Sequence, residues 1–135
     1  MKQLILLTAL FILFTSFQPD TADQPSLYHT KWVLNSIHEK NTTEYIYTRA
    51  FLQFEEETNR VSGNGSCNSF GGTMAVSEDA IQFGNLFSTK MYCAEVQEIE
   101  TLFMKQLGRV NRFVINGPFL KLYKDDTLLL CFKMG

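Results

Sequence analysis

The residues best suited to chemistry are three cysteines and two histidines. Cys67 lies in the glycine-rich run Gly63–Asn68, and Cys93 ends a second polar run. A catalytic thiol requires an activating base, and a zinc site requires several ligands at characteristic spacings. Neither His29 nor His38 shares a motif with a cysteine, and no C-x-x-C pair occurs. We therefore predict no catalytic, metal or cofactor site, and no enzymatic activity.

The cysteines are better suited to a disulfide. In the chain-entropy model, closing the loop between Cys67 and Cys93 would stabilise the fold by roughly 3–4 kcal/mol, because the cross-link restricts the unfolded chain. Cys131 is a competing partner, but it lies in the apolar run Leu128–Phe132, where a cysteine is typically a small buried side chain. Three pairings are open, with Cys67–Cys93 favoured, and a chain without a disulfide is the remaining alternative.

The glycines around Cys67 indicate a bent backbone. Gly63 and Gly65 precede it, and Gly72 follows. A phosphate-binding loop would require a helix N-terminus and a Lys-Ser/Thr pair after the glycines, and neither is present. The run therefore predicts a tightly bent pair of strands. We expect Asn68 to hydrogen-bond its local backbone and so stabilise a turn.

Thr89, Lys90 and Met91 are the best candidates for a surface with a binding role. We nevertheless favour a structural role for them, with Thr89 bonded to the backbone and Met91 packed under a helix. Glu100 lies among apolar neighbours further along the chain. Because a buried carboxylate must be hydrogen-bonded, we expect Glu100 to bond to the turn around Cys67 rather than to act as a catalytic acid.

Strands and one helix must position these residues. Short apolar runs separated by polar turns predict a meander of antiparallel hairpins. The predicted strands are Trp32–Ile37, Ala50–Phe54, Arg60–Gly63, Phe70–Val76, Ala80–Phe83, Arg112–Ile115, Phe119–Tyr123 and Leu128–Phe132. His38–Thr43 is polar and predicts a loop, whereas apolar residues recur every three or four positions between Glu95 and Arg109, which predicts a helix. The expected fold class is α+β, an antiparallel sheet of about seven to eight strands whose concave face buries the apolar face of one helix.

The first residues have the pattern of a secretory signal. Lys2 supplies a positive charge, and Leu4–Phe14 is apolar apart from Thr8. This run is too short to span a bilayer, which takes roughly 20 apolar residues. Small residues suit a processing site, so we place the cleavage between Ser16 and Ala22.

Residues 1–22 are thus predicted to be a signal and a short connecting segment, and residues 23–135 a single domain. No cysteine precedes Cys67, so the lipobox of a bacterial lipoprotein is missing. We expect an exported, soluble, periplasmic or secreted monomer without a stable membrane anchor. The net charge of −2, without a basic stripe, argues against binding of nucleic acid.

The cysteine-bearing runs and the helix also carry a family resemblance, over roughly Tyr28–Met134. The matching residues are Gly63, Gly65, Cys67, Asn68, Gly72, Thr89, Lys90, Met91, Cys93, Glu100 and Leu107. This pattern resembles the META domain, the HslJ-like heat-shock family of bacterial envelope proteins. The resemblance implies a barrel-like sheet of antiparallel strands curved around one helix, and links to heat shock, antibiotic tolerance and, in a parasite branch, virulence. It implies no catalytic residues. Many members are lipoproteins, from which this chain differs by its missing lipobox.

The predicted function is a non-enzymatic envelope or periplasmic domain that interacts with a protein partner or supports the envelope under stress. The alternative is a carrier of a small apolar ligand or lipid, because many Phe and Leu residues lie on strands that could enclose a cavity. An enzyme would require His38, Glu44 and a serine to gather in one cleft.

Overall fold

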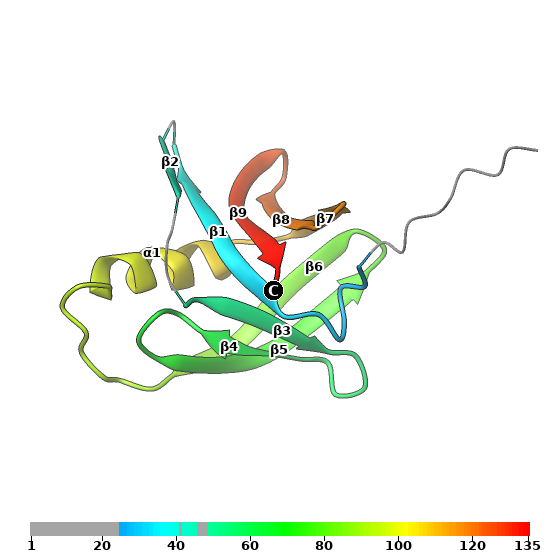
Figure 1. The fold of residues 1–135 in the computed structure, drawn as a ribbon. Helices are drawn as coiled ribbons and strands as arrows, with labels where there is room; N and C mark the ends of the chain where they lie inside the picture. The colour runs from blue at the N-terminus through cyan, green and yellow to red at the C-terminus, as the bar shows by residue number, and fades with distance from the viewer. Residues whose placement is uncertain (1–24, 41, 46–48) are drawn as a thin grey trace, which may run out of the picture.

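The computed structural model describes residues 25–135 apart from 41 and 46–48, so the predicted signal and its cleavage site lie outside the described residues. The described chain forms nine strands and one helix (Figure 1). The strands are β1 (Trp32–Glu39), β2 (Thr42–Tyr45), β3 (Phe51–Glu55), β4 (Arg60–Asn64), β5 (Ser69–Ser77), β6 (Ala80–Ser88), β7 (Arg112–Asn116), β8 (Phe119–Lys124) and β9 (Thr127–Met134). The helix, α1 (Gln97–Leu107), connects β6 to β7.

The strands form one antiparallel sheet that closes on itself. Neighbours along the chain pair from β3 to β9, and β1 joins the two ends of the series. Trp32 of β1 lies opposite Leu52 of β3 on one side and Met134 of β9 on the other. The predicted α+β class, with a curved antiparallel sheet and one helix, is confirmed, although the sheet has nine strands rather than seven or eight.

The additional strand corrects the loop predicted at His38–Thr43. β1 continues to Glu39, and β2 then returns alongside it, with Thr43 opposite His38. Lys40 adopts a positive φ of 53° in the connecting turn. The backbone hydrogen bonds of this hairpin, together with β-branched threonines, outweigh the polar composition that suggested a loop.

Other boundaries also differ from the prediction, most of all in β6 and the helix. The strand expected to end at Phe83 continues to Ser88 as β6. The helix runs over Gln97–Leu107 rather than Glu95–Arg109. Val96 precedes it without a side-chain cap, and Gly108 ends it in a right-handed helical conformation.

Large side chains fill the centre of the ring. Trp32, Phe103 and Phe132 are fully buried. The ring of Phe103, which comes from α1, lies 5.7 Å from that of Phe70 and 6.2 Å from that of Phe132, both in edge-to-face contact. The predicted burial of the apolar helix face is therefore observed, and the centre of the ring holds side chains.

Candidate functional site

Glu100 on α1 is a buried carboxylate, with 6 % of its surface exposed. Its Oε2 accepts hydrogen bonds from the backbone N–H groups of Cys67 at 2.9 Å and Asn68 at 2.7 Å. Its Oε1 accepts a third from Nδ2 of Asn68 at 2.6 Å. The predicted bonding of Glu100 to the turn around Cys67 is present.

These bonds also set the protonation of Glu100. Burial by itself would raise the pKa of the carboxyl. The hydrogen bonds from Asn68 and Cys67, assisted by the positive charge of Lys90, outweigh burial and lower the pKa. Glu100 therefore remains ionised at neutral pH, as an anchor for the loop rather than a proton donor.

The side chain of Asn68 joins three segments. Its Oδ1 accepts from Oγ1 of Thr89 and from the backbone N–H of Met91, both at 2.7 Å. Its Nδ2 donates to the Met91 carbonyl at 3.0 Å as well as to Glu100. The prediction of a local bond was wrong, because Asn64 Oδ1 accepts from the N–H of Ser66 and stabilises the turn instead.

Two motif glycines provide the space for this packing. A Cβ on Gly65 would lie 2.8 Å from Oε2 of Glu100. A Cβ on Gly72 would lie 2.8 Å from both the Gly84 carbonyl oxygen and Cδ2 of Leu86. Gly63 lies in β4 opposite Phe70. The glycine-rich run therefore permits close approach of the helix and of β6.

The predicted Cys67–Cys93 disulfide is present, with the two Cα atoms 5.9 Å apart. It ties the turn after β4 to the segment that leads into α1. Cys131 is a free, buried thiol on β9, and burial raises its pKa. With Asn68 and Glu100, the disulfide fixes residues 89–93 against the domain.

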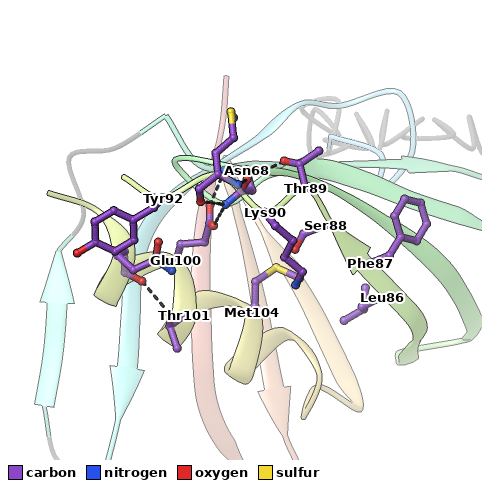
Figure 2. Close-up of a pocket in the computed structure, with 12 residues that line it drawn as sticks. Asn68, Leu86, Phe87, Ser88, Thr89, Lys90, Tyr92, Glu100, Thr101 and Met104 are labelled. Atoms are coloured by element: carbon purple, nitrogen blue, oxygen red, sulfur yellow. Dashed lines mark hydrogen bonds between the residues drawn. The ribbon is translucent and has the colours of Figure 1, made fainter. Parts of the chain in front are cut away.

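An open cleft of about 640 Å³ lies between residues 86–92 and the outer side of α1. Leu86 and Met104 form apolar parts of its walls, and Lys90 and Thr101 contribute polar groups. In Figure 2, Phe87 and Tyr92 lie on opposite sides of the view, with Lys90 and Asn68 between them. The hydrogen-bonded loop and the helix together form this candidate binding site.

Three large apolar or aromatic side chains along the cleft face solvent. Tyr92 is 79 % exposed, Phe87 60 % and Met91 59 %. Met91 therefore does not pack under the helix, contrary to the prediction. The hydroxyl of Thr89 bonds to the Asn68 side chain and not to the backbone. The expected backbone bond of Thr89 and the expected packing of Met91 were therefore wrong, although the Thr89 hydroxyl does have a structural partner in Asn68.

Sequence reasoning missed Phe87, Tyr92, Leu86 and Met104. One signal was available in the adjacent apolar pair Leu86–Phe87, because two such residues in succession break the alternation of a one-sided strand. A register shift in the β5–β6 pairing and a positive φ of 49° at Asn85 mark a bulge before this pair. The bulge changes which side chains face outward.

His38 lies in a separate polar group. The hydroxyls of Ser36 and Thr43 lie 3.0 Å from its Nε2 and Nδ1, respectively. Burial, and secondarily the charge of Lys121, lowers the pKa of His38. Glu44 lies opposite Ile37, so its side chain points to the other face of the ribbon. These residues therefore do not assemble into a serine–histidine–acid triad.

Among the residues that the structure describes, no three His, Cys, Asp or Glu side chains group as a metal site would need. No helix in the same part of the chain has the length and apolar character to cross a bilayer.

The closed antiparallel ring, its single helix and the Gly–Cys–Asn turn define a small β-rich domain. The META domain family matches residues 25–134, and the chain belongs to that family. Among curated proteins, none matches the chain.

Solved structures support the same fold. An NMR structure of a protein from Burkholderia xenovorans is 22 % identical, with a TM-score of 0.68, over 81 % of this chain and 83 % of that one. A second NMR structure is 24 % identical, with a TM-score of 0.59, over 80 % and 91 % of the two chains. A crystal structure of a DUF4847 family protein from Bacteroides vulgatus is 11 % identical, with a TM-score of 0.60, over 79 % and 93 %.

Proposed function

We propose that the protein is an exported, non-enzymatic domain that acts in the periplasm or outside the cell by binding a protein partner at the cleft beside α1. One observation carries this proposal. Phe87, Met91 and Tyr92 expose large side chains along a single cleft, on a segment fixed by a disulfide and by Asn68.

Exposed aromatic and methionine side chains that gather in one place are typical of protein interfaces. Rigidity strengthens the argument, because a loop that is already ordered loses little conformational entropy on binding. Met91 is held through its backbone at both N–H and carbonyl, so its side chain is free to contact a partner.

Export is supported by the apolar run near the N-terminus and by the disulfide, since disulfides persist mainly in oxidising compartments. A role in envelope stress is supported by membership of the META domain family. A monomer without a membrane anchor remains our expectation.

The proposal can be tested by site-specific photocrosslinking in the native host. A photoreactive amino acid at Tyr92 should yield a discrete adduct with an envelope protein. The same amino acid at Met134, which is 49 % exposed and lies outside the cleft, should not. Equal adducts at both sites, or none at Tyr92, would overturn the proposal.

A genetic experiment addresses the stress role. A deletion strain, challenged with heat and with envelope-active antibiotics, is complemented with the wild type, with Phe87→Ser/Tyr92→Ser, or with Met134→Ser. We expect the wild type and Met134→Ser to restore growth and the double variant to fail. Full complementation by the double variant would contradict a binding role for the cleft.

A carrier of a small apolar ligand is the second candidate. The observation in its favour is the volume of the cleft, about 640 Å³, which lies in the range of small-molecule pockets. Such a ligand would lie in the cleft, since Trp32, Phe103 and Phe132 occupy the centre of the ring. Binding of a fluorescent apolar dye that is abolished by Met104→Glu would favour this candidate.

A further inference from the structure

β6 pairs with a strand on each of its two edges, but the two pairings differ greatly in length. It pairs with β5 from Ala80 to Ser88, but with β7 only at Ala80, opposite Arg112. The N–H of Ile81 still donates to the Asn111 carbonyl at 3.2 Å. Beyond that bond, no described strand pairs with this edge of β6, and α1 follows instead of a strand.

The bulge at Asn85 divides this edge into two parts. The part that follows it, Leu86–Ser88, lines the cleft together with α1 (Figure 2). The sequence of β6 contains no Lys, Arg or Pro, which are the residues that commonly protect a strand edge from pairing. A backbone edge therefore faces the cleft without these protective residues.

The orientation of the edge groups follows from the neighbouring bonds. Thr89 donates its N–H to the Ser69 carbonyl at 3.0 Å, toward β5. Successive residues of an extended chain direct their N–H groups to opposite sides. The N–H and carbonyl of Ser88 therefore point away from β5, toward the cleft.

Charge at the cleft selects the occupant. Glu100 is ionised, but both of its oxygens already accept hydrogen bonds from Cys67 and Asn68. Lys90 lines the same cleft, and its charge acts on Glu100 without a direct ion pair among the described residues. An acidic group on the occupant would therefore complement the cation at Lys90.

From these observations we propose that the cleft binds an extended acidic segment of another polypeptide, which adds to β6 as a further strand beside α1. Strand addition between a sheet edge and a helix is an established mode of peptide recognition, in which backbone bonds supply affinity and side-chain contacts supply specificity. The inference rests on the proposed protein-binding function and specifies the chemistry of the partner.

Ser88 offers a direct test. Ser88→Pro removes the N–H that faces the cleft and leaves the bonds to β5 in place, because proline is tolerated where the N–H faces away from the sheet. Ser88→Ala is the matched control, since it removes only the hydroxyl. Short random peptides displayed on phage are selected on the disulfide-bonded wild-type domain, and the selected sequences are synthesised as the probes.

We expect the selected peptides to contain acidic residues next to alternating apolar positions. Their dissociation constants should increase about tenfold or more with Ser88→Pro, a loss of about 1.4 kcal/mol or more, and stay unchanged with Ser88→Ala. Methylation of peptide backbone nitrogens should weaken binding to the wild-type protein to a similar extent. This arm requires no protein variant, so misfolding of Ser88→Pro cannot obscure the result.

Lys90 provides the second arm. Lys90→Gln should reduce affinity several-fold and weaken its dependence on salt, whereas Lys90→Arg should preserve both. Failure to select any peptide, or equal binding of methylated and unmethylated peptides, would overturn strand addition. If Tyr92 still crosslinks a partner in cells under those outcomes, the protein-binding proposal stands and only its strand-addition form fails.

Discussion

At the scale of single residues, Asn68 and Glu100 account for most of the family motif. Both residues satisfy their polar groups with partners far away in the sequence. Met91 is 23 residues from Asn68, and Glu100 is 32 residues from it. The sequence predicted that Glu100 would be hydrogen-bonded, because a carboxylate among apolar residues must be. It could not predict the partners of Asn68, since an amide can equally bond to its own turn.

Glu100→Gln should destabilise the domain by about 2 kcal/mol at pH 7, because charge-assisted hydrogen bonds are worth about 1.5–3 kcal/mol. The folded-state pKa of Glu100 lies below its value in the unfolded chain, which is about 4.3. The carboxylate therefore makes its full contribution to the free energy of unfolding above that pH. This contribution is lost as the pH falls through the folded-state pKa.

Urea unfolding at several pH values measures this effect. The difference in unfolding free energy between the wild type and Glu100→Gln should be full at pH 7 and should shrink below about pH 4. Glu98→Gln, at an exposed position on the same helix, is the control and should change little. A difference that is independent of pH would contradict the assigned role.

Ser66 is a second residue with a specific expectation. It is held at a φ of 105°, and its hydroxyl is buried without a hydrogen-bond partner among the described residues. Ser66→Gly should stabilise the domain by about 1 kcal/mol, because glycine tolerates this conformation and leaves no hydroxyl unsatisfied. Thermal unfolding tests this, with Ser62→Gly in β4 as a control that should destabilise. A lower melting temperature for Ser66→Gly would show that the conformation costs little.

At the scale of elements, the segment between β6 and α1 is the least regular and the most constrained. The disulfide at Cys93 and the bonds of Asn68 to Met91 hold it from both ends. The periodicity of α1 was predictable, because its buried face repeats every three or four residues. The course of residues 89–92 was not, since it is held by the bonds of Asn68 to Met91 and by the disulfide, whose partners lie more than 20 positions apart.

Removal of the disulfide should loosen this segment. Cys67→Ser/Cys93→Ser should lose about 3–4 kcal/mol of stability, from the entropy of a loop that spans 26 positions. Reduction of the wild type with dithiothreitol should lower its urea midpoint to that of the double variant. Cys131→Ala should retain the sensitivity to the reductant. Equal midpoints before and after reduction of the wild type would contradict a stabilising role.

At the scale of the whole molecule, the class of fold was predictable because most of the described strands have apolar residues between polar turns. β2 was missed, since its four residues, Thr42–Tyr45, have no apolar run. A barrel-like sheet was expected from the family resemblance, but no periodicity in the sequence predicted which strands close it. The pairing of β1 with β9 joins residues about a hundred positions apart, Trp32 with Met134, and no local pattern encodes it.

We also expect the protein to be exported. Produced with its N-terminal run in a bacterial host, the protein should be recovered from the periplasm or medium with a new N-terminus between Ser16 and Ala22. Non-reducing mass spectrometry with peptide mapping should find Cys67 joined to Cys93 and a free thiol at Cys131. Recovery from the cytoplasm with Met1 or Lys2 still present would contradict export.

The pairing of β1 with β9 constrains when the protein can fold. β1 precedes every other described strand, yet its longest partner is β9 (Thr127–Met134), which follows all of them. Until that strand emerges, Trp32 and Leu34 have no complete site in which to be buried. A nascent chain would therefore lack its complete fold until β9 has emerged, because the β1–β9 pairing is a contact between distant parts of the sequence. The order of the strands thus makes folding late, which would suit the export that we propose.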